Sequence, residues 1–313
     1  MPQPCLIALD WGTSNARASL LGPAGESLAT CSAALGVMAV QTGGFPAALQ
    51  AICGEWLTEW DVPLIASGMI GSRQGWKEAP YLDCPAQLEA LAASLTSVET
   101  GLGERRLHIV PGLRCQDSGG QWDVMRGEET QVWGSGALRS GLCVLPGTHS
   151  KWVGREADGS LTQFRTYMTG ELFAVLSQHS ILGRLMERGP YLEDAFLTGV
   201  HRGWGNPAHA THVLFSVRTA GLMGNLGPDC LADFLSGLLI GMELASALEL
   251  FQTGDGSAGP ADICFIGDEA LCARYVTAWN CVAPSDCPVV VQKGHDASER
   301  GLWNIARAAG LLG

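Results

Sequence analysis

The stretch Leu6–Gly22, LIALDWGTSNARASLLG, decides the expected fold because it joins two strand patterns through a tight polar turn. The apolar run ends at Asp10, and Gly12 permits the chain to reverse its direction. The small polar residues of the turn are Thr13, Ser14 and Asn15. Such a turn points backbone N–H groups and hydroxyls at an anion, and Asp10 can hold Mg²⁺ through water. A plain hairpin with an aspartate in its turn is the competing interpretation.

A second stretch has the same form about one domain's length further along the chain. In Cys143–Glu156, CVLPGTHSKWVGRE, an apolar strand ends before a Gly-Thr pair and the chain folds back. Its candidate phosphate-binding residues are Gly147, Thr148, His149, Ser150 and Lys151. Together the two turns predict a phosphate clamp, although each alone is matched by an ordinary turn. The sequence has neither the P-loop pattern GxxxxGKS/T nor a GxGxxG turn after a strand.

A third element and the paired turns together resemble a known superfamily. Phe265–Leu271, FIGDEAL, is expected to be a strand, a glycine and a helix start, and Gly267 would let the backbone approach a nucleobase beside Asp268. A plain strand-to-helix turn is the alternative. The paired turns resemble the two phosphate motifs of the actin/hexokinase/heat-shock-ATPase superfamily, and FIGDEAL resembles its adenosine motif. This resemblance implies an α/β protein with two ribonuclease H-like domains of duplicated topology, with ATP in the cleft between them and Mg²⁺ organised by Asp10.

We expect the two domains to cover residues 1–136 and 137–313. The first would hold the first phosphate loop, an acceptor-binding loop and the catalytic carboxylate. The second would hold the second phosphate loop and the adenosine motif.

Residues 66–86, ASGMIGSRQGWKEAPYLDCPA, are the candidate acceptor-binding loop. Their three glycines favour a loop over a helix. The side chains that suit a small polar ligand are Ser72, Arg73, Gln74, Trp76, Lys77 and Tyr81. The planar fork of Arg73 suits a carboxylate, whereas a solvated loop that carries a cation is the alternative.

Five sequence segments of this chain resemble one family of kinases. ASGMIGSRQGW, DVMRGEETQVWG, LPGTHSKW, FRTYMTGELFAVLSQHSIL and GHDASERGLWNIA together resemble 2-keto-3-deoxygalactonate kinases, over essentially the whole chain. The resemblance implies ATP-dependent phosphorylation of the 6-hydroxyl of 2-keto-3-deoxygalactonate, giving 2-keto-3-deoxy-6-phosphogalactonate in galactonate breakdown. A kinase for another sugar or sugar acid, or a non-kinase ATP-binding regulatory module, are the alternatives.

The candidate base lies at the start of a helix before the second phosphate loop. Related sugar kinases carry an acid there, so the resemblance points to Glu129, with Glu128 next and Asp117 and Asp123 as competitors. Two acids that complement a helix dipole are the alternative. At the start of another expected helix, Thr169 and Glu171 either cap that helix or face the substrate beside the second phosphate loop.

Periodicity predicts the main elements of the chain. Three strands are expected within residues 5–31, and apolar strands near 63–68, 107–112, 141–146, 262–267 and 288–292. Helices are expected at about 46–60, 85–98, 128–139, 170–187, 191–202, 229–251, 268–280 and 297–310. The helix 229–251 contains Asp233, Glu243 and Glu249, so we expect a buried amphipathic helix and not a membrane span.

Composition narrows the function class and the compartment. The net charge of −12, without a basic stripe, argues against a nucleic-acid partner. The 11 cysteines form no CxxC pair, which favours reduced thiols in the cytoplasm. The N-terminus has no basic region of a signal peptide, and a membrane partner is not expected. The expected partners are ATP and a small sugar acid, and the oligomeric state stays open, a homodimer included.

Overall fold

The computed structural model describes residues 3–41, 43–136, 140–251, 260, 262–283 and 287–312. The chain divides into two compact units. Unit 1 comprises Met1–Ser140, Arg155–Phe164 and Gln292–Gly313, and unit 2 comprises Gly141–Gly154 and Arg165–Val291. Each unit is therefore built from more than one segment of the chain. The expected domains 1–136 and 137–313 stay a prediction.

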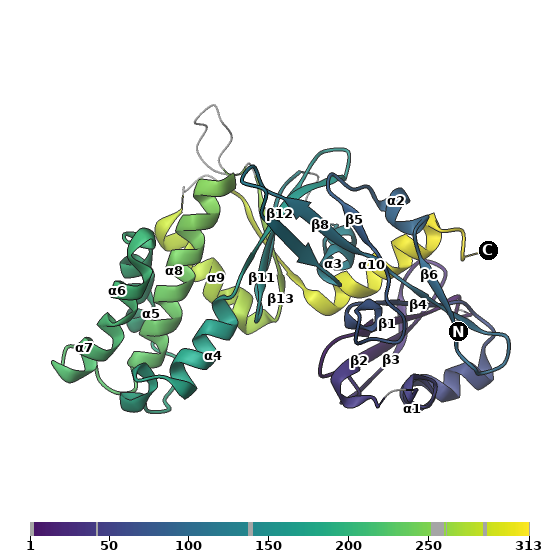
Figure 1. Ribbon diagram of the computed structural model, residues 1–313, viewed down its shortest axis with the longest axis horizontal. Coiled ribbons are helices and arrows are strands. Elements are labelled where there is room, and N and C mark those ends of the chain that lie inside the picture. The colour runs from purple at the N-terminus through teal and green to yellow at the C-terminus, as the bar shows by residue number, and fades with distance from the viewer. Residues whose placement is uncertain are drawn as a thin grey trace. The chain divides into compact units, whose positions relative to one another are not determined.

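Unit 1 is built on a six-stranded sheet with the order β3-β2-β1-β4-β7-β6 (Figure 1). Its strands are β1 (Leu6–Trp11), β2 (Ala16–Leu21), β3 (Ser27–Ala33), β4 (Leu64–Ser67), β6 (Thr96–Glu99) and β7 (Arg106–Ile109). β1 runs antiparallel to β2 and parallel to β4. Because carboxyl ends of parallel strands meet at one edge of a sheet, Asp10 lies beside Ser67 at the end of β4.

Helices and a second small sheet complete unit 1. The helices are α1 (Phe45–Glu59), α2 (Leu88–Ala92), α3 (Glu128–Gly134) and α10 (Gly294–Ala308), and the small sheet has the order β5-β8-β9. Its strands are β5 (Tyr81–Asp83), β8 (Gly112–Gln116) and β9 (Trp122–Met125). α1 packs on β2 and β3, where Phe45 and Leu49 enter the core. α10 contacts both α3 and β1, so the last helix of the chain belongs to the unit that contains the first strand.

Two glycines allow the backbones of α3 and α10 to touch. A Cβ atom on Gly134 would come within 1.8 Å of the carbonyl oxygen of Ala297. A Cβ atom on Gly301 would come within 2.0 Å of the carbonyl oxygen of Thr130. No side chain fits at either position without separating the helices, so α3 is held at a fixed place against α10.

Unit 2 contains a five-stranded sheet and most of the helices of the molecule. The sheet has the order β12-β11-β10-β13-β14, and β10 runs parallel to β13. Its strands are β10 (Gly141–Leu145), β11 (Ser150–Arg155), β12 (Leu161–Tyr167), β13 (Ile263–Gly267) and β14 (Val289–Lys293). The helices are α4 (Thr169–His179), α5 (Glu193–Trp204), α6 (Ala210–Leu214), α7 (Ser216–Leu222), α8 (Leu231–Phe251) and α9 (Glu269–Val282). The short 3₁₀ helices of the chain are η1 (Val37–Ala39), η2 (Met69–Gly71), η3 (Leu182–Leu185) and η4 (Pro207–His209).

The 21-residue helix α8 is the centre of the helical part of unit 2. It contacts α4, α5, α7 and α9, and Gly237 and Gly241 bring its backbone close to that of α5 (Figure 1). By length and a mean hydropathy of 1.6 it could cross a membrane, but 61% of that window is buried within the protein. The expectation of an amphipathic helix was wrong, because α8 is packed on several sides and carries apolar residues around its circumference.

The remaining expectations are confirmed for most elements and wrong for three helices. The strands within 5–31 and the helices near 46–60, 191–202, 268–280 and 297–310 are present. The helix expected at 85–98 is only α2, because Thr96–Glu99 forms β6 and pairs with β7. The helix expected at 170–187 ends at His179. The helix expected at 128–139 ends at Gly134, and residues 137–139 of that expectation lie outside the described residues.

Candidate active site

The first phosphate loop, Gly12–Asn15, turns its carbonyl oxygens away from the hollow beside it. The N–H of Gly12 donates to the carbonyl oxygen of Asn15 at 2.9 Å, which closes the turn. The carbonyls of Gly12, Thr13 and Ser14 accept hydrogen bonds of 3.0–3.1 Å from the backbone at and before η1. With these acceptors engaged, the exposed hydroxyls of Thr13 and Ser14 and the amide of Asn15 remain at the surface of the loop. These exposed side-chain donors are available to an anion at the loop.

A hollow of about 620 Å³ lies at this loop and is lined by Asp10, the loop and Arg17. Arg17 is the cation among the residues that line it, and sequence reasoning did not single it out. The signal was available in the hairpin register, because Arg17 on β2 pairs with Asp10 on β1. In a protein of net charge −12, an anionic ligand needs a local cation of this kind.

Asp10 is partly buried at the end of β1, and its carboxylate accepts a hydrogen bond from Ser298 of α10 at 3.2 Å. Burial raises the pKa of Asp10, and Ser298, Arg17 and His295 oppose the rise. No group of three or more His, Cys, Asp or Glu side chains in the described chain is placed to hold a metal ion. A lone carboxylate beside a polar hollow nevertheless fits Mg²⁺, which usually binds proteins through one or two carboxylates and completes its shell with phosphates and water.

The two adjacent glutamates at the start of α3 have different surroundings. Glu129 is completely buried, and both of its carboxylate oxygens accept the N–H of Gly127, at 2.7 and 2.9 Å. Burial, together with the charge of Glu128, raises the pKa of Glu129 to about 8. Glu128 is half-buried, accepts the N–H of Arg126 at 3.0 Å, and is close enough to Asp10 to raise its pKa.

The other two candidate bases accept hydrogen bonds from the backbone of the β8–β9 hairpin. Asp117 accepts the N–H groups of Gly119 and Gln121 at the hairpin between β8 and β9. Asp123 lies on β9 and accepts the N–H of Val124. Neither position is at the start of α3, so the pair Glu128 and Glu129 is the one that accompanies Asp10.

The predicted acceptor loop divides into residues that face outward and residues that hold the loop in place. The side chain of Arg73 is 89% exposed and lies 3.7 Å from Glu78. Gln74 is also exposed, whereas Ser72 is half-buried. Trp76 stacks on Phe45 with a centroid distance of 5.7 Å. Lys77 donates to the carbonyl oxygen of Ser97 at 2.9 Å.

Arg126 anchors the far end of this loop and was not singled out from the sequence. Its guanidinium lies 4.4 Å from the centre of the Tyr81 ring and donates to the carbonyl oxygen of Ala79 at 2.8 Å. Arg126 is 8% exposed, and its Nε and Nη1 atoms have no hydrogen-bond partner within the described residues. Since Glu128 follows two positions later, Arg126 connects the acceptor loop to the start of α3.

The second phosphate loop meets the start of α4 within unit 2. The N–H of Glu171 donates to the carbonyl oxygen of Thr148 at 3.0 Å, and the side chains of Glu171 and His149 are hydrogen-bonded. A Cβ atom on Gly170 would come within 2.4 Å of the carbonyl oxygen of Gly147. Glu171 therefore contacts the loop directly, and the role of Thr169 and Glu171 toward a substrate stays a prediction.

The residues of this loop differ in exposure. Thr148 and His149 are exposed, whereas Ser150 is fully buried and its hydroxyl lies 2.9 Å from the hydroxyl of Tyr275. Lys151 is 5% exposed and donates to the carbonyl oxygen of His149 at 3.0 Å. As placed here, the groups that can meet a ligand are the backbone and the side chains of Gly147–His149.

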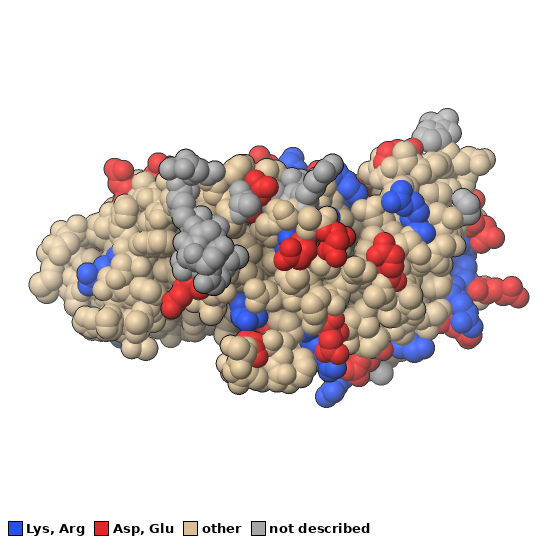
Figure 2. Space-filling model, turned by 90° about the horizontal axis from the view of Figure 1, so that it is seen from above, with Lys and Arg blue, Asp and Glu red and all other residues tan. Residues whose placement is uncertain are grey.

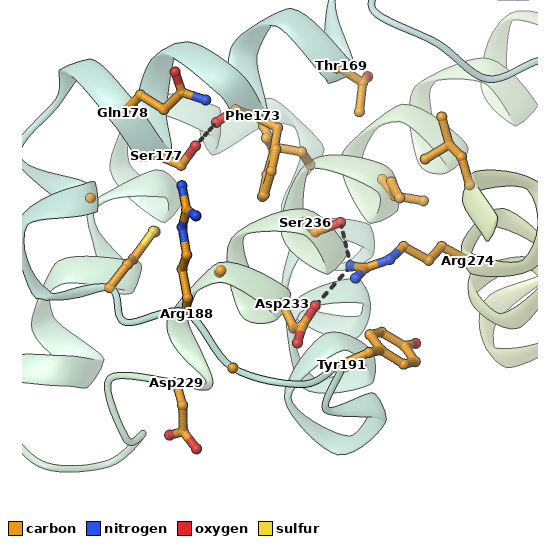
Figure 3. A pocket seen from close by; sticks show the side chains of 18 of the residues that line it. Thr169, Phe173, Ser177, Gln178, Arg188, Tyr191, Asp229, Asp233, Ser236 and Arg274 are labelled. Atoms are coloured by element: carbon orange, nitrogen blue, oxygen red, sulfur yellow. Dashed lines mark hydrogen bonds and ion pairs between the residues drawn. The ribbon is translucent and has the colours of Figure 1, made fainter. Parts of the chain in front are cut away.

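A pocket of about 700 Å³ in unit 2 begins at this loop and runs along α8 and α9 (Figure 3). Gly147, Thr169 and Gly170 line it together with the apolar side chains of Phe173, Leu239, Ile240 and Leu271. Figure 3 shows Arg274 reaching toward Ser236 and Asp233, to which it donates at 3.3 and 2.8 Å, with the Tyr191 ring beside it.

The predicted adenosine motif reaches this pocket only through its last residue, Leu271. Gly267 ends β13, and Asp268 caps α9 by accepting the N–H of Leu271 at 3.0 Å, and neither residue is among those that line the pocket. Arg274 and Tyr275, one turn further along α9, line it as well. The motif did not indicate these two residues, because a strand-to-helix turn gives no information on which helix face meets a cavity.

Comparison with known proteins gives a consistent assignment. A family model of the 2-keto-3-deoxy-galactonokinases matches residues 10–305. The 2-dehydro-3-deoxygalactonokinase of Escherichia coli (strain K12) is 38% identical over 304 residues, which cover 96% of this chain and 97% of that protein. A crystal structure from Sinorhizobium meliloti, provisionally named a 2-dehydro-3-deoxygalactonokinase, matches with a TM-score of 0.83 and 36% identity over 97% of this chain and 98% of that one.

A more distant structure supports the fold alone. The ligand-bound xylulose kinase of Lactobacillus acidophilus matches with a TM-score of 0.52 at 11% identity, covering 98% of this chain and 89% of that one. The mixed α/β architecture is thus shared with a sugar kinase. The family-model match over residues 10–305 and the 38% identity to the Escherichia coli protein place this chain in the 2-keto-3-deoxy-galactonokinase family.

Proposed function

We propose that the protein transfers the γ-phosphoryl group of ATP to the 6-hydroxyl of 2-keto-3-deoxygalactonate, forming 2-keto-3-deoxy-6-phosphogalactonate and ADP in galactonate breakdown. The observation that carries this proposal is the 38% identity to the Escherichia coli 2-dehydro-3-deoxygalactonokinase over 96% of the chain. The hollow at Gly12–Asn15 and the exposed loop Gly147–His149 supply the anion-binding elements that a kinase needs.

ATP is assigned to elements of both units. The phosphates are proposed to meet the hydroxyls of Thr13 and Ser14, the side-chain amide of Asn15, the guanidinium of Arg17, and Gly147–His149. The sequence also suggested four further residues for this site. Their proposed role is to support the residues that contact ATP: Ser150, Lys151, Gly267 and Asp268. The nucleoside is proposed to enter the 700 Å³ pocket of unit 2, whose volume and apolar walls suit a planar base.

Asp10 is the residue that would organise Mg²⁺. The bound ion would draw charge from the β- and γ-phosphate oxygens as the phosphoryl group leaves. Asp10 is suited to this task because Ser298 fixes one of its oxygens and α10 holds that serine against β1.

The base is proposed to be Glu128, which reverses the order that the sequence suggested. A base must touch the hydroxyl that it deprotonates, and the fully buried Glu129 offers no exposed oxygen. Glu128 would take the proton of the 6-hydroxyl as that oxygen bonds to the γ-phosphorus. The bond between this phosphorus and the bridging oxygen breaks, and ADP leaves with the electron pair. Glu129 would support Glu128 by capping the start of α3 through Gly127.

The acceptor is proposed to bind at the loop of residues 66–86. Arg73 and Gln74 present exposed polar groups, and Ser72 lies between them and the core. Trp76 and Tyr81 would shape the loop from beneath, because both rings are already engaged in contacts within unit 1. Thr169 and Glu171 remain candidates for contacts at the second phosphate loop.

The architecture expected from the superfamily is part of the same proposal. Both sheets place the third, second, first and fourth of their strands side by side, as β3-β2-β1-β4 and β12-β11-β10-β13. This common order supports two ribonuclease H-like domains of duplicated topology, in which 1–136 and 137–313 form the two halves and ATP lies in the cleft. By packing, the segments 155–164 and 292–313 would then be additions to the first half.

The proposed compartment is the cytoplasm. All 11 cysteines fall within the described residues and none of them is in a disulfide, which supports a reducing compartment such as the cytoplasm. On the face seen in Figure 2, acidic and basic side chains of the described residues are interspersed. ATP and the sugar acid are the proposed small-molecule partners, as the kinase family implies.

A coupled assay of ADP release with Mg-ATP tests the function. We expect strong turnover with 2-keto-3-deoxygalactonate and little with 2-keto-3-deoxygluconate, galactose or glucose. Turnover with another sugar alone would reject the proposed substrate and keep the kinase. Slow ATP hydrolysis that no acceptor changes would favour an ATP-binding regulatory module.

A further inference from the structure

A buried carboxylate lies directly behind the second phosphate loop. Glu243, in the middle of the apolar helix α8, is 3% exposed. Its Oε1 accepts the indole N–H of Trp152 on β11 at 2.8 Å, and its Oε2 accepts the hydroxyl of Tyr275 on α9 at 2.7 Å. The hydroxyl of Tyr275 lies 2.9 Å from that of Ser150, the fourth residue of the loop Gly147–Lys151. One side chain of α8 is thus joined to β11, to α9 and, through Tyr275, to the loop.

The direction of these hydrogen bonds is determined by the carboxylate. An ionised glutamate only accepts, so Tyr275 donates its proton to Glu243. The hydroxyl of Ser150 lies against both the Tyr275 oxygen and the carboxylate, so its one proton is used within this cluster. Burial raises the pKa of Glu243, and hydrogen bonds from Thr169, Trp152, Tyr275 and Ser150 oppose this rise. The hydroxyl of Ser150 is consequently committed to the interior and does not serve a ligand.

We propose that Glu243 is a positioning residue for ATP, which acts through Tyr275 and Ser150 to hold the second phosphate loop in its binding shape. The inference rests on the proposed function, in which Gly147–His149 meets the phosphates. A polar cluster in an apolar helix bundle is stabilising only when every member is satisfied, so removal of one hydroxyl leaves the others without a partner. The least costly response is movement of the loop, because Thr148 and His149 are exposed and Ser150 is its anchor.

The hydrogen bonds of Glu243 also reach residues of the pocket beside the loop. Tyr275 and Thr169 line the 700 Å³ pocket, and both are hydrogen-bonded to Glu243. The same carboxylate therefore contacts two of the residues that line the proposed nucleoside site. A residue that only filled space in α8 would not need donors from three different elements.

The test is direct titration of ATP, without acceptor, into wild-type protein and variants. Tyr275→Phe removes one hydroxyl and retains the ring in the core, and Ser150→Ala removes the other. We expect each variant to raise the Kd for ATP by about tenfold, the effect of one lost buried hydrogen bond. The double variant should bind no more weakly than either single variant, because both substitutions break the same link.

The control is a second tyrosine–serine pair in the same unit. The hydroxyl of Tyr167 lies 3.3 Å from that of Ser246 on α8, and neither residue lines the pocket or belongs to the loop. Tyr167→Phe should leave the Kd for ATP unchanged. In kinetic assays, Tyr275→Phe should raise the KM for ATP while the KM for the sugar acid changes less than about twofold.

Glu243 itself is tested by a conservative and a disruptive change. Glu243→Gln can accept from Trp152 and donate to Tyr275, so it should retain more ATP affinity than Glu243→Leu. If the Tyr275 and Ser150 variants have a Kd for ATP within about twofold of the wild-type value, this inference is overturned and the proposed function is not. A wild-type protein that binds no ATP would overturn the proposed function and, with it, this inference.

Discussion

Asp10 lies where three parts of unit 1 meet, at the end of β1, across from Arg17 and in contact with Ser298 of α10. We expect Asp10→Asn, which retains the size of the side chain and removes its charge, to lower kcat at least 10²-fold because Mg²⁺ loses its protein carboxylate. The measurement is the ADP-release assay over a range of Mg²⁺ concentrations. Ser298→Ala is the matched control, with a smaller loss, and a near-normal kcat for Asp10→Asn would remove Asp10 from the mechanism.

The two glutamates of α3 can be separated by their exposure. We expect Glu128→Gln to lower kcat by about 10²–10⁴-fold, the usual contribution of a general base. Glu129→Gln should retain most of kcat, because Gln has the same shape and Glu129 is completely buried. Steady-state kinetics of both variants at saturating ATP and sugar acid decide between them. The opposite pattern would return the base to Glu129, as the sequence first suggested.

Single residues also show what sequence reasoning can and cannot find. The turns at Gly12 and Gly147 were noticed because glycine and small polar residues follow an apolar strand at both places in the chain. Arg17, Tyr275 and Glu243 were not recognised, since their importance depends on a hairpin register and on helix contacts. Ser150 shows what a motif does not reveal, because the structure buries this hydroxyl of the predicted phosphate loop against Tyr275.

At the scale of elements, the contact between α3 and α10 leaves no room for an added side chain. We expect Gly301→Ala to lower the free energy of unfolding by about 1–3 kcal/mol, because the new methyl would overlap the backbone carbonyl of Thr130. Gly54→Ala is the control. There the added Cβ meets only the flexible end of Gln50, so alanine should be neutral or stabilise α1 by up to about 1 kcal/mol. Urea unfolding of both variants makes the comparison, and equal effects would contradict the helix contact.

The elements that the sequence did not predict are short and depend on partners. Residues Thr96–Glu99 were assigned to a helix, but their pairing with β7 stabilises a strand. Tyr81–Asp83 was read as a loop because a three-residue strand has no periodicity of its own, and it exists through its parallel pairing with β8. Long periodic segments such as α1 and α10 were found with nearly correct bounds. Apolar periodicity thus predicts elements that bury one face in the core. It does not predict short strands that form only by pairing with a neighbouring strand.

At the scale of the whole molecule, buried acids make stability depend on pH. Burial raises the pKa of Glu129 from 4.5 to about 8 in the folded protein. Between these values the unfolded chain releases a proton that the folded protein keeps, so the free energy of unfolding falls as the pH rises. Burial raises the pKa values of Asp10 and Glu243 as well, and they act in the same direction.

The test compares urea unfolding of the wild type and Glu129→Gln at about pH 5.5 and 7.5. The wild type should lose on the order of 2 kcal/mol more than the variant over this interval, because glutamine does not titrate. Parallel pH profiles for the two proteins would show that Glu129 does not remain protonated in the folded state.

The discontinuous composition of unit 1 has a consequence for synthesis on the ribosome. β1 and the first phosphate loop are translated before unit 2, whereas α10, which contacts β1 and carries Ser298, is translated after it. Every residue of unit 2 is available before α10 exists. The hydrogen bond between Ser298 and Asp10 therefore forms only after all of unit 2 has been made, and a nascent chain that lacks α10 cannot place the Asp10 carboxylate in its final surroundings.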